Sequence, residues 1–213
     1  MIFKGFVDDD HLRAGEDLFA HLRHVPIHLD DDGFDIGAYK KAAERMREEF
    51  VCFLNTKSEI LVDGWLRKLA ARLGEPGVGL VGNTGSFESH HPLYPVFPEF
   101  PNVHIRTNGF LLRRDLFRAV SAGFDIRSKY DAWMFESGPD SLSRQIVRQG
   151  LKIAVVGRDG EAYEPSRWPM SRTYRSTNDN VLIADDDYRS FPKAEATARE
   201  TLVRNVWGPC GNP

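Results

Sequence analysis

The chain has 213 residues, with 28 Lys and Arg against 31 Asp and Glu, which gives a formal net charge of −3. This length fits one domain or two small ones and can bury a core without disulfides. The balanced charge excludes a nucleic-acid binder that relies on a strongly basic surface. No apolar run approaches the roughly 18 residues of a membrane span, so no transmembrane segment is expected.

The N-terminal segment and the cysteines indicate the cellular compartment. Residues 1–10 become acidic at once and lack the basic and apolar regions of a signal peptide. Cys52 lies in an apolar run and Cys210 lies in a Gly/Pro-rich tail, so neither a disulfide framework nor a zinc site is predicted. We therefore expect a cytoplasmic protein.

The first eighty residues alternate short apolar runs with amphipathic stretches, a pattern typical of an α/β fold. The run 50–54 is apolar throughout, as in a central strand of a parallel sheet. Asp63 is suited to cap the helix that follows it. In chain order, the pattern predicts a strand at 1–7, a helix at 12–22, a strand at 25–29, a helix at 36–47, strands at 50–54 and 78–81, and between these last two a helix at 63–73.

The middle of the chain changes character. Residues 83–101 contain four prolines and predict a long irregular loop, which in a compact domain is usually functional or mobile. We expect one domain over 1–207 with a polar C-terminal extension at 160–207, followed by a disordered tail at 208–213. The remaining predicted elements are strands at 103–105, 109–112, 152–156 and 181–184 and helices at 114–122 and 141–149.

Three aspartate triplets each follow a strand-like run, at 8–10, 30–32 and 185–187. In open α/β sheets, ligands gather beyond the carboxyl ends of strands. Clustered carboxylates there hold a divalent cation or accept hydrogen bonds from sugar hydroxyls. The alternative is three solvated turns, because Asp also favours turns.

Two further segments carry the polar residues expected of a ligand site. Gly33 and Gly37 flank Asp35 where a helix begins, and a helix N-terminus favours an anion such as phosphate. Asn55 to Glu59 follow the most apolar strand, and Lys57 is suited to neutralise a diphosphate. The alternatives are a plain strand-to-helix connection and a surface loop.

The order of these segments resembles the GT-A glycosyltransferases of the rhamnosyltransferase-like, nucleotide-sugar-dependent group, over residues 30–156. The wording "LNTKSE" after an Asp-Ile-Gly segment is similar to a variant in rhamnan-synthesis-type enzymes. The motifs that carry the resemblance are Gly33-Phe34, Phe53-Leu54-Asn55, Trp65-Leu66 with Leu69, Val78-Gly79-Leu80-Val81-Gly82, Thr107 to Phe117, and Ser141-Leu142-Ser143-Arg144 with Gly150.

The resemblance implies a GT-A-like (Rossmann-like), mixed and mostly parallel sheet flanked by helices. It also implies transfer of a sugar from a nucleotide-sugar donor to a glycan or lipid-linked acceptor in surface polysaccharide synthesis. The substrate-binding residues that we predict are Asp9, Asp32, Asp35, Gly37, Asn55, Lys57, Ser58, Glu59, His104, Arg106 and Asn108.

The sequence departs from the family in its metal motif and its catalytic acids. The acid-x-acid motif reads Asn55-Thr56-Lys57, so either Lys57 replaces the cation electrostatically or the metal, Mn²⁺ or Mg²⁺, is lost. The catalytic acids fall on Gly138-Pro139. Glu136 is therefore our choice of base, with Asp131 and Asp140 as the other candidates; a helix-start role for Glu136 is equally compatible.

The sequence also lacks the family's first strand, so we expect a diverged member or one that takes this strand from a partner chain. Two other classes stay open: a non-catalytic domain that binds sugars or a partner, and a metal-dependent hydrolase that uses the Asp clusters. Glu88, His90 and His91 suggest a metal only weakly, because neighbouring histidines rarely reach one ion together. Trp133, Trp168 and Tyr174 fit either sugar stacking or the core.

Overall fold

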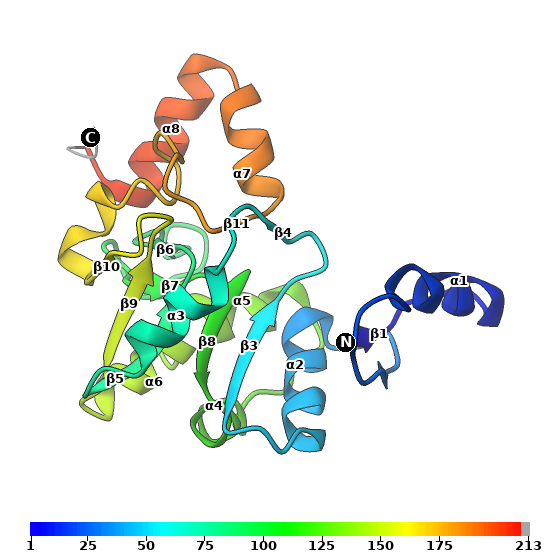
Figure 1. Ribbon diagram of the computed structural model, residues 1–213. Helices are drawn as coiled ribbons and strands as arrows, with labels where there is room; N and C mark the ends of the chain where they lie inside the picture. Colours follow the sequence, from blue (N-terminus) through cyan, green and yellow to red (C-terminus); the bar gives the residue numbers. More distant parts are fainter. Residues whose placement is uncertain (210–213) are drawn as a thin grey trace.

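The computed structural model describes residues 1–209 and is built around a five-stranded sheet with the strand order β10-β9-β5-β8-β3. Helices cover both faces of this sheet (Figure 1), which confirms the predicted α/β class. The strands are β3 (Phe50–Leu54), β5 (Val78–Gly82), β8 (Gly109–Arg113), β9 (Lys152–Val156) and β10 (Ala162–Tyr163).

The sheet is mixed, but its antiparallel pairs outnumber its parallel pair. Strands β5 and β9 run parallel, whereas β8 is antiparallel to both β3 and β5, and β10 is antiparallel to β9. The run 50–54 forms an edge strand, not the predicted central strand of a parallel sheet. Its apolar character reflects helices on both faces, which an antiparallel strand can have as well.

The two faces of the sheet are packed by different helices. Phe110 and Leu112 lie in the larger core with α2 (Phe34–Arg45), α4 (Arg114–Ser121), α5 (Lys129–Ser137) and α6 (Leu142–Arg148). Leu111 points the other way, into a smaller core with α3 (Trp65–Leu73), because successive side chains of a strand alternate between faces. The N-cap of α3 is Gly64 with φ of 71°, not Asp63 as predicted.

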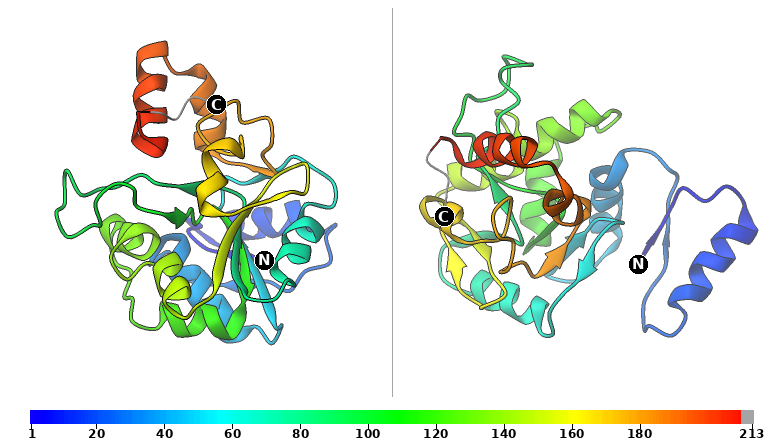
Figure 2. Two further views of the ribbon diagram at one scale, coloured as in Figure 1. Left: turned by 90° about the vertical axis from the view of Figure 1, so that its left-hand side faces the viewer. Right: turned by 90° about the horizontal axis from the view of Figure 1, so that it is seen from above.

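The first 29 residues form an arm beside the main body (Figures 1 and 2). Strands β1 (Ile2–Phe3) and β2 (Ile27–His28) pair in parallel around α1 (Asp9–Phe19), which has no buried residue. Asp8 caps α1 by accepting a hydrogen bond from the His11 amide, so this triplet begins a helix.

The segment 83–101 is irregular, as predicted, except for β6 (Gly85–Ser86), which pairs with β7 (His104–Ile105). Gly85 is required there because the Cβ of any other residue would lie 2.5 Å from the indole of Trp168. Trp168 is fully buried and donates its indole N–H to the Tyr163 carbonyl. It therefore belongs to the core rather than to a sugar platform.

The C-terminal part contains more helix than the sequence predicted. Strand β11 (Ile183–Ala184) pairs with β4 (Glu59–Ile60) and leads into α7 (Asp186–Ser190). Asp185 caps α7. Figure 1 shows α7 and the last helix, α8 (Ala196–Trp207), above one end of the sheet. Four predicted tail residues, 210–213, lie outside the described part of the chain; the other elements here are η1 (Pro165–Met170) and η2 (Phe191–Lys193).

The buried side chain of Asn83 fastens this part to the sheet. It donates to the Ile183 carbonyl at 2.6 Å and accepts from the amides of Leu182 and Ile183 at 3.2 and 3.0 Å. Within residues 1–209, no helix is long and apolar enough to cross a membrane.

Candidate functional site

A cavity of about 1250 Å³ opens where β3 ends and β8 begins. Antiparallel neighbours bring these two chain positions to the same edge of the sheet. The N-terminus of α2 and the side chains of α5 from Lys129 to Glu136 form further parts of the wall. Six predicted site residues from four separate segments line this one cavity: Asp32, Asp35, Asn55, Arg106, Asn108 and Glu136.

Glu136 is held by two hydrogen bonds from one residue. Its Oε2 atom accepts from the Thr107 amide at 2.6 Å and from the Thr107 hydroxyl at 2.5 Å. Every hydrogen bond that it accepts from residues 1–209 goes to Oε2, so Oε1 is available to a ligand. Glu136 lies in the last turn of α5, not at a strand end as predicted. The helix starts with a capping box between Ser128 and Asp131.

The charge state of Glu136 depends on its neighbours. Burial alone would raise its pKa, but His104, Arg106 and the hydrogen bonds from Thr107 together lower it. For His104, burial has the opposite effect and lowers the pKa, although the nearby charge of Glu136 raises it in part. The His104 ring is therefore neutral near pH 7. At that pH, Arg106 and Thr107 keep Glu136 ionised.

Arg106 is the centre of a network that closes one side of the cavity. Its guanidinium pairs with Asp185 at 3.0 Å and Asp187 at 2.5 Å and stacks 4.0 Å above the Tyr174 ring. Burial opposes its charge, but Tyr174, Asp185 and Asp187 raise its pKa. The Asn108 amide also donates to Asp185 at 2.8 Å. Two acids of the third triplet, Asp185 and Asp187, are thus engaged with Arg106 or Asn108, and Asp185 also serves as the cap of α7.

Asp35 has the opposite environment to Glu136. It lies in the first turn of α2, is half-buried and accepts no hydrogen bond from the described residues. Burial raises its pKa, although Lys4 and Lys129 partly offset the effect. Two carboxylates with opposite pKa shifts therefore face one cavity, an arrangement found at acid–base sites.

The cavity also offers an aromatic surface. Trp133 of α5 lines it, with the His90 ring 4.8 Å away at an interplanar angle of 31°. Aromatic faces suit the apolar face of a sugar ring. Of the three aromatic residues singled out in the sequence, Trp133 and Tyr174 line the cavity.

Other predicted residues lie beside the cavity or away from it. Lys57 pairs with Asp186 at 3.4 Å, and Ser58 donates to Asn55 at 2.9 Å. None of the remaining predicted residues lines the cavity. Glu59 pairs with Arg189, Asp140 pairs with Arg148, and His104 is buried close enough to Glu136 to affect its pKa. Gly37 is in the first turn of α2, Asp9 is in the arm, and Asp131 belongs to the capping box of α5.

Sequence reasoning missed several residues of the cavity wall. Thr107 is the important one, because it positions Glu136. Arg175 was a candidate partner for phosphate or for the C-terminal acids, and in the structure it pairs with Glu88 at 3.1 Å. Thr107 is adjacent to two predicted residues, which was a usable signal. Arg175 lies 68 residues further along than Thr107, and nothing in its local sequence links it to this edge of the sheet.

The residues that replace the family's metal motif do not fit a cation. Asn55 Oδ1 already accepts from Ser58 and from the Lys57 amide, and Lys57 itself is positive. Within residues 1–209, no group of three or more His, Cys, Asp or Glu side chains is placed to hold a metal ion. This geometry also gives no support to the hydrolase interpretation of the Asp clusters.

Comparison with known proteins gives little to add. No protein-family model matches the chain, and no curated protein matches it. The solved structure of HddC from Yersinia pseudotuberculosis matches with a TM-score of 0.36 and 10% sequence identity, over 55% of this chain and 57% of that chain. The match spans little more than half of either chain, and a likeness this low carries no argument about function.

Proposed function

We propose that the chain is a glycosyltransferase that moves a sugar from a nucleotide-sugar donor to a hydroxyl of a glycan or lipid-linked acceptor. The observation that carries the proposal is the convergence of six residues, predicted from separate segments, on one cavity. Its volume of about 1250 Å³ suits a ligand larger than a typical small molecule.

Glu136 is the proposed base. Its Oε1 atom takes the proton of the acceptor hydroxyl, the hydroxyl oxygen bonds to the anomeric carbon, and the bond from that carbon to the diphosphate breaks with its electron pair on the leaving group. Thr107 fixes the orientation of the carboxylate, which such a transfer requires. Lys4, Arg127 and Lys129 also line the cavity and supply positive charge for the diphosphate.

Trp133 is the proposed platform for a sugar ring, and Asp32 and Asp35 are the proposed acceptors for sugar hydroxyls. Carboxylates and an aromatic face together provide the directional and apolar contacts that a pyranose needs. Asp35 is also the alternative base, because its raised pKa makes it the stronger proton acceptor of the two.

Thermal melting against a panel of nucleotide-sugars tests the donor site. A ligand at about 100 times its dissociation constant adds roughly 2.7 kcal/mol, which gives a visible shift. The shift should persist in Glu136→Gln, whereas turnover with that donor should fall at least about 100-fold, within the range for loss of a general base. Asp35→Asn with normal turnover would retain Glu136 as the base.

The exposed Glu44 on α2 provides the matched control. Glu44→Gln removes the same charge from the same part of the fold but should leave both the shift and the turnover unchanged. A protein that binds glycan without any nucleotide, and shows no turnover with any donor, would instead be a binding domain. That outcome would end the transferase proposal.

A further inference from the structure

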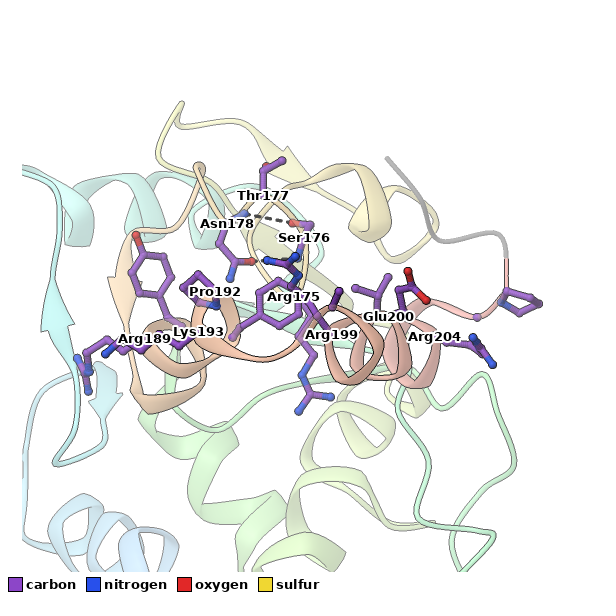
Figure 3. Close-up of a pocket in the computed structure, with 16 residues that line it drawn as sticks. Arg175, Ser176, Thr177, Asn178, Arg189, Pro192, Lys193, Arg199, Glu200 and Arg204 are labelled. Carbon is purple, nitrogen blue, oxygen red and sulfur yellow. Dashed lines mark hydrogen bonds between the residues drawn. The ribbon is translucent and has the colours of Figure 1, made fainter.

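A second cavity, of about 1020 Å³, lies in the C-terminal part between the loop 175–178 and the segment α7–η2–α8. Figure 3 shows side chains reaching it from both sides, with the loop on one side, Arg189 towards one end and Arg204 towards the other. None of the predicted site residues lines this cavity.

The lining is strongly basic although the whole chain is acidic. It contains five cationic side chains and one carboxylate, that of Glu200, against a net charge of −3 for the chain. Some of these cations are already paired: Arg175 pairs with Glu88, and Arg189 pairs with Asp186 and Glu59. The ion pairs of residues 1–209 leave three lining cations without a carboxylate: Lys193, Arg199 and Arg204.

The same cavity has an apolar wall. Phe191, Pro192, Ala196, Val203 and Pro209 line it beside the cations. A cavity for a small inorganic anion needs cations and hydrogen-bond donors but no such wall. Cations next to an apolar surface instead suit an amphiphile, whose charged group and hydrocarbon part are desolvated together.

Arg175 connects this cavity to the first one, because it lines both. Its backbone is held in the left-handed region with φ of 41°. Asn178 of the same loop has φ of 54°, and Arg172, which precedes the loop, has φ of 56°. Such conformations cost free energy in residues other than glycine and often mark ligand sites. The guanidinium also lies 5.1 Å from the Tyr174 ring, which fixes its position between the two cavities.

We infer that the second cavity binds the diphosphate of an amphiphilic acceptor, with the cations Lys193, Arg199 and Arg204 on the diphosphate and the wall around Phe191 and Val203 on its hydrocarbon chain. This inference rests on the proposed function, since it specifies the lipid-linked class of acceptor. Arg175 lines both cavities, so a diphosphate bound in the second cavity lies next to the first. A sugar attached to that diphosphate would then reach the first cavity, where it would receive the transferred sugar.

The test uses calorimetric titration with farnesyl diphosphate, below its micelle concentration, as a soluble prenyl diphosphate. Farnesyl diphosphate should bind at least tenfold tighter than inorganic pyrophosphate, because only the former uses the apolar wall. The triple variant Lys193→Gln, Arg199→Gln, Arg204→Gln should weaken it at least tenfold. A control variant with the same loss of charge, at exposed positions outside both cavities, is Arg23→Gln, Arg118→Gln, Arg158→Gln.

Two results would overturn the inference. Equal affinity for pyrophosphate and farnesyl diphosphate would show that the apolar wall is not used. Equal weakening in the triple variant and its control would show general charge attraction rather than a site. Tight binding of a nucleoside diphosphate that the triple variant abolishes would assign the cavity to the donor instead and would also refute it.

The outcome is separable from that of the proposed function. Donor binding is read from melting with nucleotide-sugars and depends on the first cavity. If no nucleotide-sugar binds but farnesyl diphosphate binding still depends on the three cations, the transferase proposal fails while the second site stands. Glu136→Gln should leave farnesyl diphosphate affinity unchanged, because Glu136 lines only the first cavity.

Discussion

Replacing Asn83 by alanine should lower the free energy of unfolding far more than replacing an exposed asparagine by alanine. The side chain is fully buried and makes three hydrogen bonds to the backbone of residues 182 and 183. Asn83→Ala leaves two amides and one carbonyl buried without a partner. Each such group costs about 1–3 kcal/mol, so the summed loss, allowing for partial relaxation, is about 3–4 kcal/mol.

Urea unfolding followed by circular dichroism measures this loss. With a slope of about 2–3 kcal/mol per molar urea, the midpoint should fall by more than about 1 M. Asn205→Ala, an exposed asparagine on α8, should change the midpoint little. Hydrogen exchange should also become faster at the amides of Leu182 and Ile183, which the side chain now protects.

A loss below about 1 kcal/mol, with unchanged exchange at both amides, would refute the reasoning. It would mean that β11 is held by other contacts, such as its pairing with β4. Fast exchange at both amides without a change in the midpoint would mean that the segment opens locally, as a separate unit from the sheet.

Three further predictions concern single residues. Gly85→Ala should lower the melting temperature by several degrees, because overpacking costs about 1–3 kcal/mol, whereas Gly123→Ala, with nothing within 4 Å of its Cβ, should not. Asp35→Asn should raise the melting temperature at pH 7, because the folded-state pKa of Asp35 is raised and its charge destabilises the fold above that pKa. The gain should shrink as the pH falls through the folded-state pKa and should vanish below about 3, where Asp35 is protonated in both the folded and the unfolded state. A lower melting temperature of the variant at pH 7 would contradict this reasoning. Burial raises the pKa of Cys52 to about 12, so peptide mapping after alkylation of the native protein at pH 8 should find Cys52 unmodified; rapid modification would show that the thiol is accessible.

The helices and strands with clear periodicity were predictable. The bounds of β3 and β9 agree with the sequence prediction to the residue, and those of α4 differ by one residue. These segments have an uninterrupted apolar run or a regular apolar face. Strand direction was not predictable in this way, because coverage of both faces gives the same apolar run in parallel and antiparallel sheets.

The helices α5 and α8 were missed for a physical reason. Both carry few apolar residues at regular spacing, and α8 buries only Val206 and Trp207. The sequence signal for α5 was the capping box formed by Ser128 and Asp131. A search for regularly spaced apolar residues does not detect this signal. For the cavity, residues that follow strands were predictable as a group. The place of Arg175 in the same wall was not, since only the tertiary fold brings it to this edge.

The network around Arg106 also has a consequence in time. Its bonds to Asp185 and Asp187 join positions 79 and 81 residues apart, and contacts between distant positions form late because closing a long loop costs entropy. A ribosome that has delivered the whole five-stranded sheet, complete at Tyr163, has not yet delivered these acids. The first cavity therefore acquires that wall only after the sheet can already have folded, because the partners of Arg106 are made more than twenty residues after Tyr163.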